Sequence, residues 1–230
     1  MNLIFDIGYN KGEFASKCFK KHPSCQVIGV DANLSLIYNK QQMTEQLVLI
    51  HALVASGEKE YEDFYIEPYQ NGISTASLNF MENSRFTRGS KNLPPNSANW
   101  SIKTQVRTTT LDQLIEKYGA PELIKIDVEG YEYEVLKGLS QKQNKICFEW
   151  HEEEYDTLLN IIKHLQSIDY NEFGVIGYFD EGSVFEKATY SERGDPYLEE
   201  PTAYYTWKEL GIEELVSPER RVNYGMMWCK

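Results

Sequence analysis

Short apolar segments alternate with amphipathic ones over residues 3–168. Five runs have the length of buried strands: Leu3–Ile7, Gln26–Val30, Leu47–Val54, Leu123–Asp127 and Ile146–Trp150. Apolar residues recur at helical spacing in five other segments: Glu13–Lys21, Asn33–Met43, Leu111–Tyr118, Tyr131–Leu139 and Tyr155–Ile168. Strands separated by helices predict an α/β fold, a doubly wound sheet of parallel strands with right-handed crossovers.

One long segment in the middle of the chain breaks this alternation. Residues 69–103 are rich in Asn, Ser, Gly and Pro, and they carry Arg85, Arg88 and Lys91 in an otherwise acidic chain. A long segment without regular structure inside a compact domain is usually functional or disordered. We therefore predict an inserted loop that contacts the acceptor or forms a lid.

The end of the chain is also irregular. Residues 179–222 are rich in acidic residues and tyrosine, and they predict a variable C-terminal region. The apolar run Tyr224–Trp228 predicts a last strand that closes the edge of the sheet, and the alternating run Tyr61–Ile66 predicts a further extended segment. No repeat divides the chain, so we predict one domain over residues 1–230.

Composition and charge exclude several classes of protein. The chain has 230 residues, 23 basic and 35 acidic, with a net charge of −12. This balance argues against a nucleic-acid partner, which would require a basic face. The longest apolar runs are too short for a membrane span, and an apparent core strand directly follows Met1, so we expect no signal peptide. Four scattered cysteines fit reduced thiols in a cytoplasmic protein.

A glycine-containing turn follows the first strand. Asp6, Gly8 and Gly12 lie in the order that brings a turn to the start of a helix, and Asp31 ends the second strand. Such a turn allows a ligand to approach the backbone, while the acid would accept the hydroxyls of a ribose. A plain strand-turn-helix with a surface aspartate is the alternative. Because Asp6 would repel a pyrophosphate but attract a sulfonium, the pattern favours S-adenosylmethionine over a dinucleotide.

Longer motifs make the sequence resemble a known family. The segments FDIGYNKGEF at residues 5–14, VDAN at 30–33, TTLD at 109–112, LIKIDVEGYE at 123–132 and FEWH at 148–151 resemble the FkbM family of S-adenosylmethionine-dependent methyltransferases. The resemblance covers about residues 3–175. It implies a class I methyltransferase (Rossmann-like) fold with seven strands in the order 3-2-1-4-5-7-6, mostly parallel with an antiparallel C-terminal strand. It also implies O-methylation, often of sugar hydroxyls.

Three features depart from the family pattern. Tyr9 replaces the small residue that is usual in the turn, the chain starts directly at the first strand, and the region after about residue 175 matches nothing in the family. The residues expected to contact the cofactor lie at the ends of the first four predicted strands: Asp6, Gly8, Tyr9, Asn10, Gly12, Asp31, Ala32, Ala52 and Asp127.

The candidate catalytic residues lie at the ends of the fourth and fifth strands. We expect His151 to accept the proton of the acceptor hydroxyl, because the ordinary pKa of histidine lies near neutrality. Asp127 is the second candidate, and Glu149 shares the face of His151 by strand alternation. His151 is alternatively a structural histidine. These three residues would also suit Mg²⁺ or Mn²⁺, but we expect no metal.

Candidate acceptor contacts lie mainly in the inserted segment. Ser74, Ser77, Glu129 and Trp100 would suit the hydroxyls and rings of a small-molecule or glycan acceptor, and Arg85 would suit a phosphate. A solvated loop is the alternative. The tyrosines of the C-terminal region would suit either a sugar or a homodimer surface.

Two other classes of function stay open at this point. An NAD-dependent oxidoreductase would use Asp31 on the ribose of its cofactor, although the glycine spacing and Asp6 argue against it. A non-catalytic module would keep the fold without a cofactor pocket, and Tyr9 is the residue that would support it. Binding of S-adenosylhomocysteine or NAD separates these possibilities.

Overall fold

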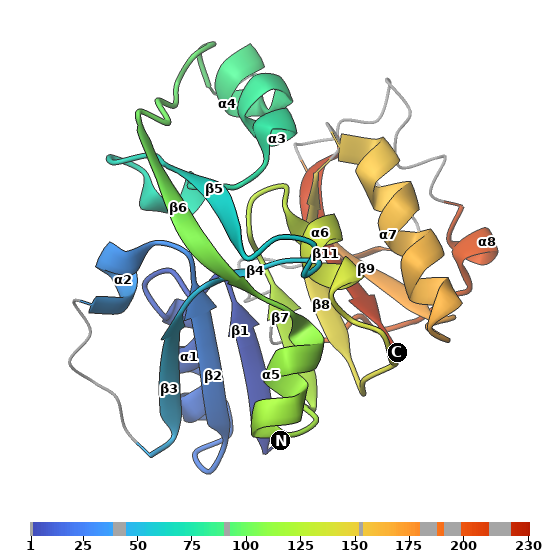
Figure 1. Ribbon diagram of the computed structural model, residues 1–230. Coiled ribbons are helices and arrows are strands. Elements are labelled where there is room, and N and C mark those ends of the chain that lie inside the picture. The colour runs from blue at the N-terminus through green and yellow to red at the C-terminus, as the bar shows by residue number, and fades with distance from the viewer. Residues whose placement is uncertain are drawn as a thin grey trace.

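The computed structural model describes residues 2–38, 45–89, 93–151, 154–179, 188–190, 199–211 and 222–230. Most of residues 179–222 and Lys91 therefore lie outside the described part of the chain, and so does Tyr197 of the C-terminal region. The predicted doubly wound α/β fold is confirmed (Figure 1).

The main sheet has eight strands in the order β10-β9-β11-β8-β7-β1-β2-β3. Their bounds are β1 Leu3–Ile7, β2 Gln26–Asp31, β3 Leu47–His51, β7 Leu123–Ile126, β8 Ile146–His151, β9 Phe173–Phe179, β10 Ala188–Tyr190 and β11 Val222–Cys229. Strand β11 is antiparallel to β8 and β9, and the other pairs are parallel. The predicted seven-strand order is confirmed, with β10 as an unpredicted eighth strand, because three residues are too few to show a periodic pattern.

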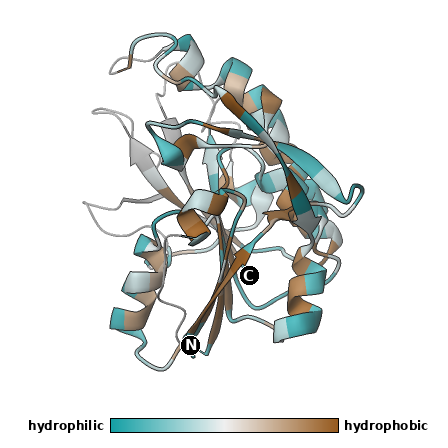
Figure 2. Cartoon of the chain, turned by 60° about the vertical axis from the view of Figure 1, so that its left-hand side comes forward, coloured by the Kyte–Doolittle hydropathy of each residue, from teal (hydrophilic) through white to brown (hydrophobic). Residues whose placement is uncertain are grey.

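Helices cover both faces of this sheet. Helix α1 (Glu13–Lys21) packs Phe14, Ala15 and Cys18 against one face. Helices α5 (Leu111–Tyr118), α6 (Glu132–Lys137) and α7 (Tyr155–Ser167) pack against the other. Two further short helices are α2 (Leu34–Tyr38) and α8 (Trp207–Leu210). Figure 2 shows the result, with apolar strands inside and polar helix surfaces outside.

A smaller sheet lies beyond the carboxyl ends of the central strands. It contains β4 (Leu53–Val54), β6 (Ile102–Thr109) and β5 (Tyr61–Ile66), in that order. The predicted strand over residues 47–54 is therefore two strands in two sheets, with Ala52 between them. Strand β6 was not predicted. Its outward positions are polar or exposed and only Val106 is buried, so it has no apolar pattern.

The inserted segment is more regular than predicted. After β5 it forms the 3₁₀ turn η1 (Asn71–Ile73) and the helices α3 (Leu78–Asn83) and α4 (Arg85–Arg88). Phe80 on α3 is buried against the rings of Phe86 and Trp100. These elements lie over the carboxyl end of the sheet (Figure 1), and we call residues 69–89 the lid.

The described part of the chain contains no helix that is both long and apolar enough to cross a bilayer.

Candidate active site

The turn after β1 is built around a close approach of two strands. Gly8 has a φ of 78°, and a Cβ atom placed there would lie 1.8 Å from the carbonyl oxygen of Asp127 at the end of β7. A side chain at this position is therefore excluded by the protein backbone itself. Gly12 has a φ of 75° and is the N-cap of α1, so both glycines are required by the local conformation.

Asp31 at the end of β2 holds this turn in place. Its Oδ2 atom accepts a hydrogen bond from the backbone N–H of Asn10 at 2.7 Å, and its Oδ1 atom accepts one from Asn33 at 2.7 Å. Asn10 has a φ of 47°, and an asparagine tolerates this left-handed conformation better than most residues. Burial raises the pKa of Asp31, while the two backbone hydrogen bonds act against that rise. Each carboxylate oxygen keeps a lone pair for a ligand.

A cavity opens where the turn meets the ends of β2 and β7 and the start of β4. It brings together six of the residues predicted to contact the cofactor: Gly8, Asn10, Asp31, Ala32, Ala52 and Asp127. Two residues predicted to contact the acceptor, Ser74 and Glu129, also line it. The lid closes the cavity through Asn71, Gly72 and Ala76. This position, at the carboxyl ends of the strands where the order reverses, is where doubly wound folds bind ligands.

Three predicted cofactor residues do not line this cavity. Gly12 caps α1, and Asp6 is completely buried behind the turn. The side chain of Tyr9 packs into the apolar cluster beneath α1 and covers Gly29, where a Cβ atom would lie 2.4 Å from its ring. Tyr9 instead borders a second cavity, between the turn and α1, together with Lys11 and Lys17.

Lys125 lies at the centre of the site and was missed by the sequence reasoning. It is opposite Asp6 in the register of β1 and β7, and its Nζ atom lies 3.1 Å from Asp6 Oδ1 and 3.5 Å from Asp127 Oδ2. The same ammonium donates to the carbonyl oxygen of Gly8 at 2.8 Å. Its neighbouring carboxylates raise the pKa of Lys125 against the opposing effect of burial. The available signal was a lysine inside the apolar strand 123–126.

Burial affects the pKa of Asp6 more strongly than its ion pair with Lys125 does. The side chain is wholly inaccessible, and desolvation raises its pKa to about 6, with Lys125 acting in the opposite direction. The charge of Asp6 therefore reaches the cavity through Lys125, which joins it to Asp127. Whether Asp6 also contacts the cofactor directly stays a prediction.

Carboxylates from β7, β8 and the turn after β7 gather beside Lys125. The Asp127 and Glu149 side chains are at hydrogen-bond distance, and the pKa of Glu149 is raised well above its usual range by burial and by Asp127. Glu129 has a φ of 55°, and burial followed by the charge of Glu149 raises its pKa as well. Asp127 is the most accessible of the three predicted catalytic side chains, with 24% exposed, and it lines the cavity.

His151 is enclosed between the lid and Glu149. The Arg85 guanidinium on α4 lies 2.7 Å from its Nδ1 atom, and its Nε2 atom lies 3.3 Å from Glu149 Oε2. Because an arginine can only donate, Nδ1 is the acceptor and the ring proton of the neutral histidine is on Nε2. The side chain is buried and does not line the cavity.

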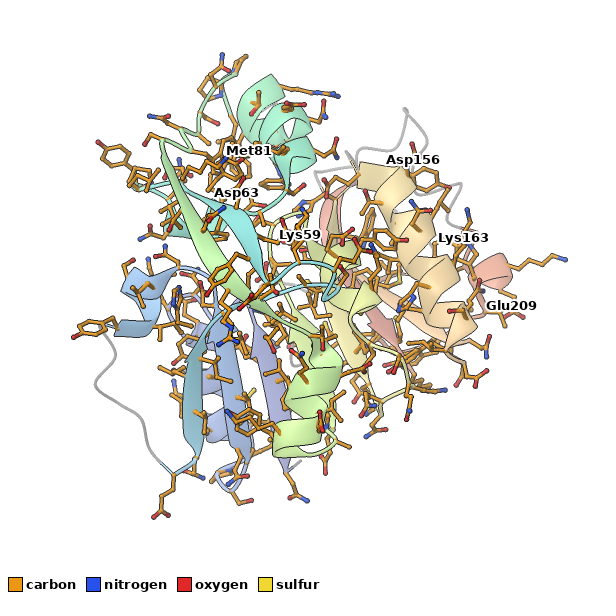
Figure 3. All side chains as sticks on the ribbon, in the orientation of Figure 1. Lys59, Asp63, Met81, Asp156, Lys163 and Glu209 are labelled. Atoms are coloured by element: carbon orange, nitrogen blue, oxygen red, sulfur yellow. The ribbon has the colours of Figure 1, made fainter. Side chains whose placement is uncertain are left out.

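Polar contacts from the lid dock it onto this site. Thr75 Oγ1 donates to the carbonyl oxygen of Glu129 at 2.7 Å, and Asn79 donates to Glu154 at 2.9 Å. The ring of Phe80 lies 5.3 Å from that of His151. The hydrogen bond between Asn79 and Glu154 connects α3 to the start of α7. Figure 3 labels Met81 on α3 and Asp156 on α7. Thr75 was also missed, because nothing local in the sequence indicates a partner so distant.

Other residues predicted to bind the acceptor have structural partners. Ser77 caps α3 by accepting from the N–H of Phe80 at 3.0 Å, and Trp100 donates to the carbonyl oxygen of Ile73 at 2.7 Å. Ser74 accepts from the N–H of Glu67 at 3.1 Å and still borders the cavity. Arg85 contacts His151, and Arg88 donates to Asn83. Arg85 and Arg88, two of the cations expected to suit a phosphate, thus contact other residues of the protein.

The family is established by a model of the methyltransferase FkbM domain, which matches residues 6–172. A match over this much of the sequence shows that the chain belongs to the FkbM methyltransferase family. The predicted family is confirmed, and so is S-adenosylmethionine as the cofactor that this family assignment implies.

Comparison with solved structures gives distant likenesses. The precorrin-6y C5,15-methyltransferase of Geobacter metallireducens GS-15 has a TM-score of 0.42 and 10% identity, covering 99% of this chain and 80% of that one. The plantazolicin methyltransferase BpumL, solved with SAH, has a TM-score of 0.40 and 10% identity, covering 100% of this chain and 76% of that one. No function is inferred from likenesses at this level. A comparison with curated proteins finds no match.

Proposed function

We propose that this methyltransferase transfers a methyl group from S-adenosylmethionine to a hydroxyl group of a sugar or glycoconjugate. The observation that supports it most is the cavity shared by the turn, Asp31, Asp127 and the lid. Residues predicted to contact the cofactor and residues predicted to contact the acceptor line this same cavity. A hydroxyl acceptor is favoured because the carboxylates of Asp127 and Glu129 are among the residues that line the cavity.

The residues present suit the cofactor. The carboxylate of Asp31 keeps one lone pair on each oxygen for the ribose hydroxyls, and Ala32 and Ala52 offer small apolar surfaces beside it. Gly8 and Asp127 would face the methionine part, where a carboxylate stabilises positive charge. When bound, the cofactor supplies an electrophilic methyl group on a sulfonium.

Asp127 is the residue best placed to accept the proton of the acceptor hydroxyl. It lines the cavity, and the ammonium of Lys125 lies 3.5 Å from its carboxylate. His151 was the preferred base from sequence, but in this arrangement its Nδ1 atom accepts from Arg85 and its proton faces Glu149. We therefore propose that His151 is not the base, and that alignment of the hydroxyl with the methyl group supplies much of the rate.

Ligand-dependent thermal unfolding tests the cofactor site. S-adenosylhomocysteine at 100 times its Kd should stabilise the protein by about 2.7 kcal/mol, whereas NAD should leave the melting temperature unchanged. Asp31→Asn should weaken this binding, and Asp112→Asn, outside the cavity, is the matched control. A shift with NAD alone would favour an oxidoreductase, and no shift with either ligand would favour a non-catalytic module.

Transfer of labelled methyl groups tests the acceptor and the base. The protein should methylate at least one member of a panel of oligosaccharides, nucleotide sugars and glycolipids, and the product should be stable to mild base, as expected for an ether and not for an ester. Asp127→Asn should lower kcat by about 10²–10⁴, a larger factor than its effect on the Kd of S-adenosylhomocysteine. Transfer only to amines or carboxylates would reject the proposed acceptor class.

A further inference from the structure

A compact group of metal-type donors lies behind Asp127. One ligand atom each of Glu129, Glu149 and His151 lies within 4.8 Å of the others. Glu149 and His151 come from the same face of β8, and Glu129 comes from the turn after β7, where both it and Gly130 have positive φ. The fold therefore brings these side chains together from two neighbouring strand ends.

The described residues leave this group short of positive charge. Asp6, Asp127, Glu129 and Glu149 would carry four negative charges if all were ionised. Among the residues that the structure describes, the cations that contact them or interact with them are Lys125, paired with Asp6 and Asp127, and Arg85, close to Glu149. Two further positive charges would balance the group.

Glu149 adds an independent observation. The residue is 8% exposed, and its Oε2 atom is buried with no hydrogen-bond partner among the described residues. A buried carboxylate oxygen in this state is costly unless a proton or a cation satisfies it. Its other neighbour is the Asp127 carboxylate, which cannot donate while both are ionised.

We propose that Glu129 and Glu149 bind one divalent cation of the Mg²⁺ or Mn²⁺ type. Such ions prefer oxygen ligands and are commonly held by one or two carboxylates, with water or substrate in the other positions. His151 Nε2 lies 3.3 Å from Glu149 Oε2 outside hydrogen-bond geometry, so His151 packs beside this ligand, and its protonated nitrogen does not coordinate the ion. This replaces the expectation of no metal. Two charges on the ion also supply the balance that the acidic group lacks.

The cation site depends on the geometry alone, whereas its role in the reaction depends on the proposed function. An ion at this position, adjacent to Asp127, would bind the acceptor hydroxyl and lower its pKa. Asp127 would then accept a proton that is already easier to remove. Metal binding and methyl transfer can therefore be tested separately.

Titration of the chelator-treated full-length protein with Mn²⁺, followed by calorimetry and by the electron paramagnetic resonance of free Mn²⁺, tests the site. We expect one Mn²⁺ per chain, competed by Mg²⁺. Glu149→Gln and Glu129→Gln should each weaken binding by about tenfold or more, and the exposed Glu116→Gln should not change it. Binding that is absent at millimolar Mn²⁺, or equal in Glu149→Gln and the unmodified protein, would overturn the proposal.

Thermal unfolding separates loss of the site from loss of the fold. Without metal, Glu149→Gln should melt no lower than the unmodified protein, because it removes a buried repulsive charge, but Mn²⁺ should no longer raise its melting temperature. If this variant does not fold, Glu129→Gln gives the same test. Mn²⁺ binding without S-adenosylhomocysteine binding would retain the cation site and reject the proposed methyl transfer.

Discussion

Several residues of this site are held in place by direct contacts with one another. Lys125 illustrates this most clearly, because one ammonium contacts the carboxylates of Asp6 and Asp127 and the carbonyl oxygen of Gly8. These contacts connect the interior of β1, the turn and the carboxylate of Asp127, which we propose as the base. The lysine is therefore a positioning residue as well as a buried counterion.

Replacing Lys125 should show how much the stability of the fold depends on its contacts. Lys125→Met leaves Asp6 buried without its partner, so we expect a loss of about 3–5 kcal/mol in the free energy of unfolding. Urea denaturation measures it, with the exposed Lys20→Met as the control. Adding Asp6→Asn should recover part of the loss, because the two residues act as a pair. A double variant whose loss equals the sum of the single losses would contradict this coupling.

Sequence reasoning succeeded where a residue's role follows from its immediate neighbours. It identified Gly8, Asp31 and Asp127 at the ends of strands, where the structure places them around one cavity. It missed Lys125, because only the pairing of β1 with β7 gives that side chain its partners. The orientation of His151 also could not be predicted, since it depends on Arg85, 66 positions away in sequence.

Helices with a clear local pattern were predicted from the sequence, whereas helices held mainly by distant contacts were not. Helices α1 and α5 have the predicted bounds, and α5 is capped by Thr110, whose Oγ1 atom accepts from the N–H of Gln113 at 3.1 Å. Both have a clear apolar face. The lid helices α3 and α4 were predicted as a loop because they are short and packed largely by Phe80 alone.

Gly130 marks the point at which the lid rests on the sheet. It has a φ of 85°, and a Cβ atom there would lie 2.7 Å from Phe80 Cβ and 2.8 Å from Glu154 Oε2. Gly130→Ala should therefore destabilise the protein by about 1–3 kcal/mol more than Gly211→Ala, because the extra methyl group overpacks this contact. Gly211 is the matched control, with a φ of 62° and its nearest atom 4.0 Å away.

Chemical denaturation of both glycine variants measures this difference. Each substitution carries the cost of placing an alanine at positive φ, so the difference isolates the contact with Phe80 and Glu154. Equal losses for the two variants would show that the lid adjusts freely around Gly130.

The whole molecule combines a strongly negative net charge with carboxyl groups buried beneath the lid. Burial raises the pKa of Glu132 from 4.5 to about 8 and that of Asp6 from 3.8 to about 6. At a pH between the ordinary and the raised pKa of each group, the folded protein therefore binds more protons than the unfolded chain. Its stability should fall as the pH rises from about 5 to 8, by about 1.4 kcal/mol per pH unit for each group titrating.

Urea denaturation of the metal-free protein across this range tests the expectation. Glu132→Gln keeps an oxygen to accept from the N–H of Val128, as Glu132 Oε1 does at 3.0 Å, but removes the titration. The free energy of unfolding of this variant should fall less steeply with pH, by up to about 1.4 kcal/mol per pH unit, because one titrating group is removed. An unchanged slope would show that Glu132 is ionised in the folded protein at neutral pH.

The two sheets are also joined in a way that limits how the molecule can open. Strands β3 and β4 are consecutive, with Ala52 as the single residue between them, and Ala52 donates to the carbonyl oxygen of Asp31 at 3.2 Å. The small sheet is thus tethered to the large one beside the cofactor cavity and cannot swing away as a separate body. Any movement of the lid relative to the sheet should therefore require breaking the contacts of Thr75, Asn79 and Arg85.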